Sequence, residues 1–126
     1  MRILIIEDSD TIRHMLETLL TAGGHAVEAV SSGPRGVEVA SDRPPDVVLL
    51  DLHLQGAFDG FEACARLKAA PTTQEIPIIV ISALADEASK ERALGAGASA
   101  YYTKPFSPFA LLKEIESIAA RSSTRL

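Results

Sequence analysis

Polar and ionisable side chains follow four of the short apolar runs in this sequence, where buried strands would end. Glu7 and Asp8 follow the first run, Asp51 the third, Ser82 the fourth and Lys104 the fifth. Because the carboxyl ends of parallel strands share one edge of a sheet, we expect these side chains to meet there. Carboxylates in close contact repel one another, so the cluster requires a neutralising cation. Oxygen ligands favour a hard ion such as Mg²⁺, which accepts few carboxylates and keeps several waters.

These groups suit the transfer of a phosphoryl group to a carboxylate. Carboxylate-held Mg²⁺ can take one phosphate oxygen, Lys104 can hold a second as a point charge, and Ser82 can donate a hydrogen bond to a third. Positioning and charge neutralisation do most of the catalysis in such a transfer, and an aspartate can act as the nucleophile. Each residue alone has an ordinary structural explanation, such as a helix cap at Glu7 and Asp8. Only the combination predicts this chemistry.

Five apolar runs alternate with helical patterns along the chain. The runs lie at residues 3–6, 25–30, 47–50, 76–81 and 100–103, and three of them are nearly continuous Ile, Val and Leu. That composition is typical of strands buried on both faces, whereas the polar residues of the second and fifth runs suit edge strands. The helical patterns lie between a cap at Ser9 or Asp10 and Gly23, and at 34–40, 60–69, 86–94 and 108–120.

The alternation of strand and helix predicts one α/β domain with a parallel sheet covered by helices. We expect residues 1–120 to form this domain and residues 121–126 to form a polar tail. The first helical pattern leaves three polar residues on its outer side: Arg13, His14 and Glu17. In the third, the candidate inward residues are Phe61, Cys64, Ala65 and Leu67.

Composition excludes several classes of protein. The 126 residues are 47% apolar, enough for one sizeable core. The net charge is −5 without a cluster of Lys and Arg, which argues against direct binding of nucleic acid or of an anionic membrane. The single cysteine, Cys64, cannot form an internal disulfide. No apolar stretch is long enough for a signal peptide or a membrane span, so we expect a cytoplasmic protein.

The motifs together resemble the receiver domains of two-component response regulators. They are Ile-Leu-Ile-Ile-Glu-Asp at 3–8, Val-Val-Leu-Leu-Asp at 47–51, Ile-Ile-Val-Ile-Ser-Ala at 78–83 and Gly-Ala-Ser-Ala-Tyr-Tyr-Thr-Lys-Pro-Phe at 97–106. The resemblance covers residues 2 to about 120. It implies a doubly wound, flavodoxin-like fold, with a parallel sheet of five strands in the order 2-1-3-4-5 and five helices.

The resemblance also implies a role for each residue of the site. Asp51 is the phosphoacceptor. The metal ligands are Glu7, Asp8, Asp51 and the backbone carbonyl of His53, and they hold Mg²⁺, for which Mn²⁺ can substitute. The residues that contact the phosphoryl group or switch with it are Ser82, Tyr101 and Lys104. The Lys104–Pro105 peptide bond is expected to be cis, a form that is accessible before proline.

The same resemblance implies the partners. A histidine kinase or a phosphotransfer protein would supply the phosphoryl group. Phosphorylation would then change the face formed by the fourth helix, fifth strand and fifth helix, which signals to an unidentified protein target or output domain. Such a phosphoprotein catalyses its own phosphorylation and dephosphorylation and is not a metabolic enzyme. The sequence leaves open whether the receiver stands alone or is a module of a longer chain.

The chain departs from the family pattern at two places. Its acidic pair is Glu7-Asp8, where Asp-Asp is also common. Between Asp51 and the pair Asp59-Gly60 the family usually has a proline and one fewer residue, so the loop around Gln55-Gly56-Ala57 is altered. The extra residue comes after His53, which leaves the predicted metal ligands in register.

Three other functions compete with this interpretation. Phosphatases of the aspartyl-phosphate type need a second Asp two residues after the nucleophile, where this chain has His53, and cap segments that a short chain lacks. A flavin-binding module needs a phosphate-cradling loop after the first strand, where Glu7 and Asp8 would repel phosphate in the absence of a metal. A receiver that serves only for docking is disfavoured by the complete acidic set.

Overall fold

The structure is a computed structural model that describes residues 1–123 of the chain. Strands and helices alternate along the whole of this length, as the apolar runs predict. The elements are β1 (Arg2–Ile6), α1 (Asp10–Ala22), β2 (Ala26–Val30), α2 (Gly33–Asp42), β3 (Val47–Asp51), α3 (Gly60–Ala69), β4 (Ile78–Ser82), α4 (Glu87–Gly95), β5 (Ala100–Thr103) and α5 (Pro108–Ser123).

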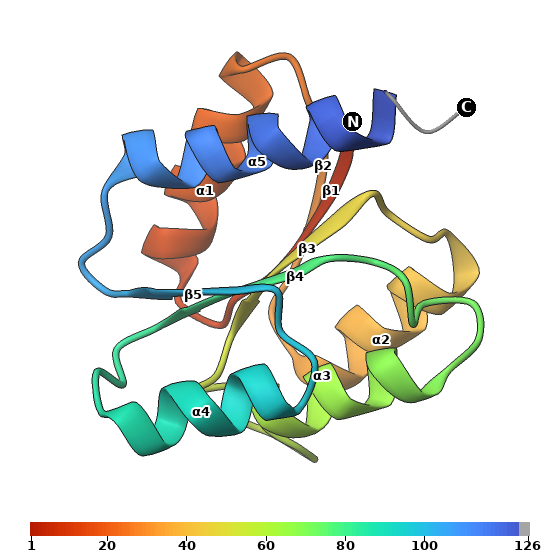
Figure 1. Ribbon diagram of the computed structural model, residues 1–126, viewed down its shortest axis with the longest axis vertical. Coiled ribbons are helices and arrows are strands. Elements are labelled where there is room, and N and C mark those ends of the chain that lie inside the picture. The colour runs from red at the N-terminus through yellow and green to blue at the C-terminus, as the bar shows by residue number, and fades with distance from the viewer. Residues whose placement is uncertain (124–126) are drawn as a thin grey trace.

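The strands form one parallel sheet in the order β2-β1-β3-β4-β5, which confirms the predicted fold class and topology. The strands β1, β3 and β4 lie inside the sheet, and β2 and β5 are its edges (Figure 1). Every residue of β3 and β4 is buried, whereas most of β2 and β5 is only partly buried. The polar content of the second and fifth runs therefore predicted the edges correctly.

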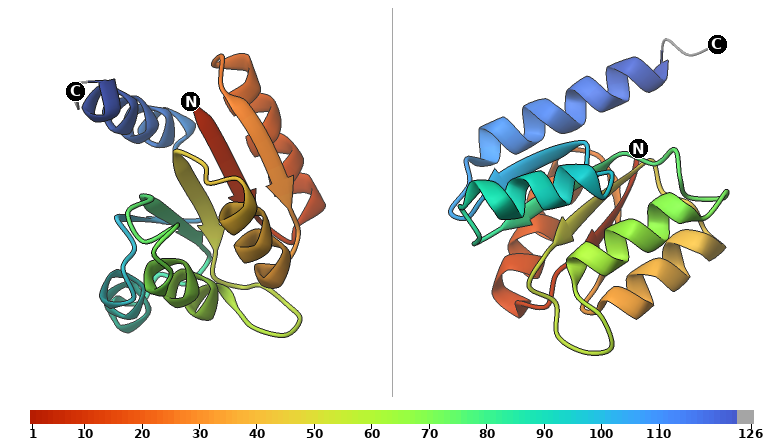
Figure 2. Two further views of the ribbon diagram at one scale, coloured as in Figure 1. Left: turned by 90° about the vertical axis from the view of Figure 1, so that its right-hand side faces the viewer. Right: turned by 60° about the horizontal axis from the view of Figure 1, so that its bottom comes forward.

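Helices cover both faces of the sheet. Leu16, Leu20, Leu111 and Ile115 of α1 and α5 pack on one face, together with alternate strand residues such as Ile3. The opposite face packs against α2, α3 and α4 through a second apolar cluster. Figures 1 and 2 show α1 and α5 on one side of the sheet and the other three helices on the second side. Because β1, β3 and β4 are sandwiched in this way, their ends are firmly placed.

Among the element boundaries that differ from the sequence-based prediction, two have a clear local physical reason. The fourth strand begins at Ile78 and not at Ile76, because the Ile76 amide donates to Thr73 in a turn and Pro77 has no amide hydrogen. The fourth helix begins at Glu87, since Asp86 is its N-cap and accepts a hydrogen bond from the amide of Ser89.

Helix α3 turns Ala63, Cys64 and Leu67 into the core, whereas Ala65, which the sequence suggested as an inward residue, is exposed. Helix α5 continues to Ser123, three residues beyond its expected end. The first part of the predicted tail is therefore helical, and residues 124–126 lie outside the described residues. Across residues 1–123, no helix combines the length and the apolar character needed to cross a bilayer.

Candidate metal and phosphoryl-transfer site

The polar residues singled out in the sequence lie at the carboxyl edge of the sheet. Glu7 and Asp8 directly follow β1, Asp51 is the last residue of β3, and Ser82 is the last residue of β4. Lys104 directly follows β5. Since β1, β3 and β4 are neighbours in the sheet, residues that are far apart in the sequence meet in one place.

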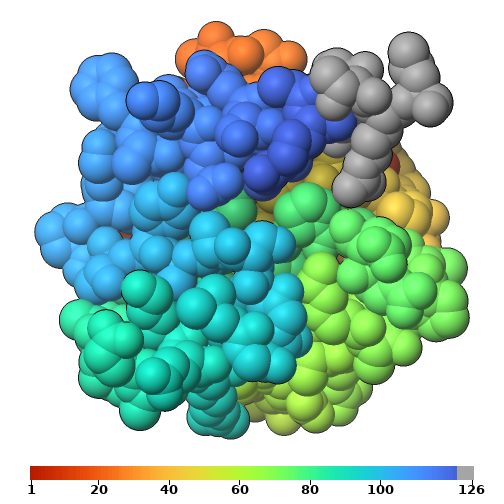
Figure 3. Space-filling view, in the orientation of Figure 1, coloured from red at the N-terminus to blue at the C-terminus, as the bar shows by residue number. Residues whose placement is uncertain are grey.

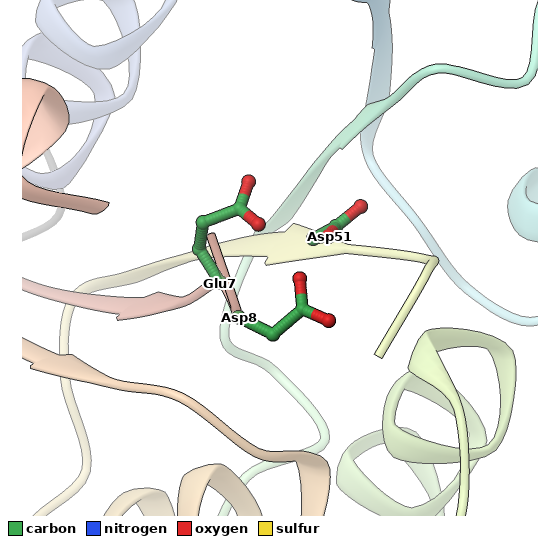
Figure 4. A group of neighbouring side chains, drawn as sticks. All are labelled: Glu7, Asp8 and Asp51. Carbon is green, nitrogen blue, oxygen red and sulfur yellow. The ribbon is translucent and has the colours of Figure 1, made fainter. Parts of the chain in front are cut away.

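Three carboxyl groups form an acidic cluster at this edge. Glu7, Asp8 and Asp51 each place one carboxylate oxygen within 4.8 Å of those of the other two. Figure 4 shows Glu7 and Asp8 leaving β1 beside the end of β3, which carries Asp51. The side chains of Glu7 and Asp51 are each only 3% exposed. Water therefore screens their mutual repulsion poorly.

Lys104 places its ammonium group against this cluster. Its Nζ lies 2.7 Å from Oε1 of Glu7 and 3.6 Å from Oδ1 of Asp51, and its side chain is 17% exposed. The Lys104 amide donates to the Ser82 carbonyl at 2.7 Å, and the Lys104–Pro105 peptide bond is cis. One ammonium group cannot neutralise three carboxylates, so the cluster keeps an excess of negative charge.

Burial and the neighbouring charged groups have opposing effects on the pKa of Glu7. Burial raises the pKa of the Glu7 carboxyl above its ordinary value, the hydrogen bond from Lys104 opposes the rise, and Asp51 adds to it. The Ser9 amide also stabilises the ionised form, because it donates to Oε2 of Glu7 at 3.1 Å. The net effect is that Glu7 holds its proton more tightly than an exposed glutamate does.

Ser82 is fully buried and is linked to Tyr101 through the backbone of Leu84. The Leu84 amide donates to Oγ of Ser82 at 3.1 Å, and the Tyr101 hydroxyl donates to the Leu84 carbonyl at 2.5 Å. Tyr101 also packs against the apolar cluster on the α2, α3 and α4 side of the sheet. A change at Ser82 can therefore reach β5 through two hydrogen bonds.

The backbone after β3 closes tightly around Asp51. The His53 amide donates to Oδ1 of Asp51 at 3.1 Å, while the His53 side chain is exposed. The Gly60 amide donates to the Leu52 carbonyl at 3.1 Å, and a Cβ atom at Gly60 would lie 2.2 Å from the Asp51 carbonyl oxygen. Only glycine allows α3 to begin this close to the end of β3.

The loop before α3 is anchored by Phe58. The guanidinium carbon of Arg66 lies 4.1 Å from the centre of the Phe58 ring. The Phe58 ring also packs closely against α2, because a Cβ atom at Gly33 would lie 2.9 Å from the ring. The loop is thus held by a specific aromatic contact, which the sequence did not predict.

Arg13 was predicted to point outward, and the structure corrects this. Its Nη1 donates to the Glu7 carbonyl at 3.0 Å, and its guanidinium also pairs with Asp10. The Arg13 side chain is 21% exposed. Helical periodicity assigns only the direction in which a side chain leaves its helix, and the long arginine bends back over the first turn of α1 to reach Glu7.

A comparison with known families agrees with this geometry. The family model described as "Response regulator receiver domain" matches residues 3–116. The chain belongs to this family. It is a receiver domain of the kind found in two-component signalling, and the predicted resemblance is confirmed.

Similar proteins differ in how much they contain beyond the receiver domain. Over 117 residues the chain is 36% identical to the response regulator PleD of Caulobacter vibrioides, covering 93% of this chain and 26% of PleD. It is 37% identical over 119 residues to the protein PilH of Pseudomonas aeruginosa, covering 94% of this chain and 98% of PilH. The chain therefore spans about a quarter of one relative and nearly all of another.

A solved structure also resembles this receiver domain closely. It is the receiver domain of the sensor histidine kinase PA1611 from Pseudomonas aeruginosa, described with a magnesium ion coordinated in its active-site cleft. The two chains share 29% identity with a TM-score of 0.86, over 94% of this chain and 97% of the other. Receiver folds of this kind thus occur both in response regulators and in kinases.

Proposed function

We propose that this receiver domain accepts a phosphoryl group on Asp51 from a phosphohistidine in a donor protein. The observation that carries the proposal is the position of Asp51. Its carboxylate is buried at the end of the central strand, next to two other carboxyl groups and within 3.6 Å of the Lys104 ammonium. A buried acidic cluster of this kind is unfavourable for stability alone, which favours a functional explanation.

The residues present fit a magnesium site. All three clustered side chains offer oxygen ligands, and within the described part of the chain a single ammonium group, that of Lys104, contacts them and leaves their charge partly uncompensated. Glu7, Asp8 and Asp51, with the backbone carbonyl of His53, would hold the ion, and Mn²⁺ could replace it. When bound, Mg²⁺ neutralises carboxylate charge and draws in a phosphoryl oxygen.

In the proposed transfer, a carboxylate oxygen of Asp51 attacks phosphorus in line with the bond to the donor imidazole. A P–O bond forms to Asp51 as the P–N bond breaks, and the leaving nitrogen keeps the electron pair and takes up a proton. Lys104 stabilises the charge on the phosphoryl oxygens, which is the main catalytic requirement of such a transfer. Water later attacks phosphorus, which releases inorganic phosphate and restores the carboxylate.

We infer that the signal leaves the site through Ser82. A phosphoryl oxygen on Asp51 would accept a hydrogen bond from the Ser82 hydroxyl, and a turn of this side chain toward it would weaken the bond in which Oγ now accepts from the Leu84 amide. Because Tyr101 donates to the Leu84 carbonyl, a shift of this loop would change the population of conformations of β5 and α4. Figure 3 shows α4, β5 and α5 forming one continuous face, which a protein target or an output domain could contact.

The test is intact-protein mass after incubation with a small acyl phosphate and Mg²⁺. We expect the wild type to gain one phosphoryl group in a Mg²⁺-dependent way, and Asp51→Asn to gain none. Asp59→Asn is the matched control, because Asp59 is an exposed N-cap of α3 and asparagine caps helices equally well. A folded wild type that gains no mass with Mg²⁺ present would instead be a receiver that serves only for docking.

A further inference from the structure

Arg13 makes a contact outside its own helix, in addition to the ion pair with an acid on the same helix. Its side chain is 21% exposed and reaches the Glu7 carbonyl, whereas its ion-pair partner Asp10 is 90% exposed. Arg35 offers a comparison within the same chain, in the first turn of α2. It pairs with Glu38 on its own helix, with a side chain that is 57% exposed. Pairing with an acid on the same helix therefore leaves an arginine solvated, and the burial of Arg13 comes from reaching Glu7.

The carbonyl that Arg13 holds belongs to the peptide unit between Glu7 and Asp8. On one side of this unit, the Glu7 amide donates to the Val30 carbonyl of β2 at 3.0 Å. On the other side, the Ser9 amide donates to the Glu7 carboxylate at 3.1 Å. The Arg13 guanidinium fixes the carbonyl between these two points. Without these contacts the backbone torsions at Glu7 and Asp8 would be less restricted, and the direction in which the Asp8 side chain leaves the backbone depends on those torsions.

We propose that Arg13 is a positioning residue for the metal site, which holds the Glu7–Asp8 peptide so that both carboxylates face Asp51. The inference rests on the proposed function, because it assigns Arg13 to the same site. A positioning role and a purely electrostatic role of Arg13 predict opposite effects of its removal on the affinity for Mg²⁺. The positive charge of Arg13 alone would weaken the binding of a cation, so its removal would strengthen binding. Loss of a positioning contact would weaken binding, as the loss of an outer-shell partner of a metal ligand does.

The experiment measures Mg²⁺ affinity without any phosphoryl donor. The full chain is titrated with MgCl₂ at constant ionic strength, and the amide resonances of Asp8 and His53 are followed by NMR. We expect Arg13→Met to weaken the binding of Mg²⁺ about tenfold, the lower end of the effect of losing an outer-shell partner. Arg13→Lys keeps one donor group and should recover part of the affinity. Arg35→Met, which removes the ion pair with Glu38 on α2, should leave the affinity for Mg²⁺ unchanged.

The outcomes separate this inference from the proposed function. Unchanged or tighter Mg²⁺ binding in Arg13→Met, with a wild type that binds the ion, overturns the role of Arg13 and leaves the proposed function standing. A wild type that binds no Mg²⁺ overturns the proposed metal site itself. Thermal unfolding in the presence of EDTA distinguishes a merely structural role, which would lower the metal-free midpoint and leave the affinity of the folded protein unaltered. If Arg13→Met does not fold, Arg13→Lys carries the same comparison.

Discussion

Glu7 is the residue at which burial and charge oppose each other most directly. Its side chain is 3% exposed, it contacts Lys104 at 2.7 Å, and it lies beside Asp51 and Asp8. The Lys104 ammonium lies closer to this glutamate than to Asp51, at 2.7 Å against 3.6 Å.

The raised pKa of Glu7 predicts that protons compete with Mg²⁺. Because burial favours the protonated carboxyl, Glu7 takes up its proton at a higher pH than an exposed glutamate does. Binding of Mg²⁺ must then displace this proton. We expect Mg²⁺ affinity, measured by NMR titration, to fall as the pH is lowered from about 7.5 to about 5, a range in which an ordinary glutamate stays largely ionised. Glu7→Gln should bind more weakly at every pH and show a shallower pH dependence. An equally steep dependence in Glu7→Gln would assign the competing proton to another group.

At the scale of the elements, the apolar runs predicted the strands and therefore the site. A polar residue directly after a buried strand must lie at the edge of the sheet, so the ends of β1, β3, β4 and β5 gave the positions of Asp51 and its neighbours. The position of Arg13 could not be predicted in this way, because it depends on the conformation of a long side chain. The contacts of the Phe58 ring could not be predicted either, since its partners Gly33 and Arg66 belong to other elements.

The start of α3 is packed tightly against the strand end that carries Asp51. A Cβ atom at Gly60 would lie 2.2 Å from the Asp51 carbonyl oxygen and 2.5 Å from Cα of Leu52, and both of these are backbone atoms that cannot turn aside. We expect Gly60→Ala to lower the free energy of unfolding by about 1 to 3 kcal/mol, as overpacking does. The displaced strand end should also slow phosphorylation of Asp51 by a small donor. Chemical denaturation and intact mass against time measure the two effects.

Gly95 provides the opposite case. It lies in the last turn of α4, and a Cβ atom there would meet nothing within 4 Å. Gly95→Ala should therefore leave phosphorylation unchanged and stabilise the domain slightly, because alanine is favoured over glycine in a helix by up to about 1 kcal/mol. If both alanine variants had the same stability and the same rate, the close packing at Gly60 would not constrain Asp51.

At the scale of the whole molecule, the site opens beside an apolar groove. This groove lies between α1 and the segment that joins β5 to α5, and its volume is about 410 Å³. It is lined by Ile12, Met15, Lys104, Pro105, Phe106 and Pro108. Lys104 belongs both to the groove and to the acidic cluster. A protein that brings a phosphohistidine to Asp51 would therefore cover the groove as it approaches, and a small donor would not.

Because only a protein donor would cover the groove, a substitution there should slow transfer from a protein donor and not from a small one. Met15 is 43% exposed at the groove, and a glutamate there would place a charge in the apolar contact. We expect Met15→Glu to slow transfer from a phosphorylated histidine phosphotransfer domain that serves the wild type by about tenfold, which corresponds to about 1.4 kcal/mol. Phosphorylation by a small acyl phosphate should keep its rate, since a small donor does not have to cover the groove. Leu94→Glu is the matched control, because Leu94 is 41% exposed on α4 and lies outside the groove. Equal rates for Met15→Glu and the wild type with the protein donor would show that the donor approaches Asp51 from another side.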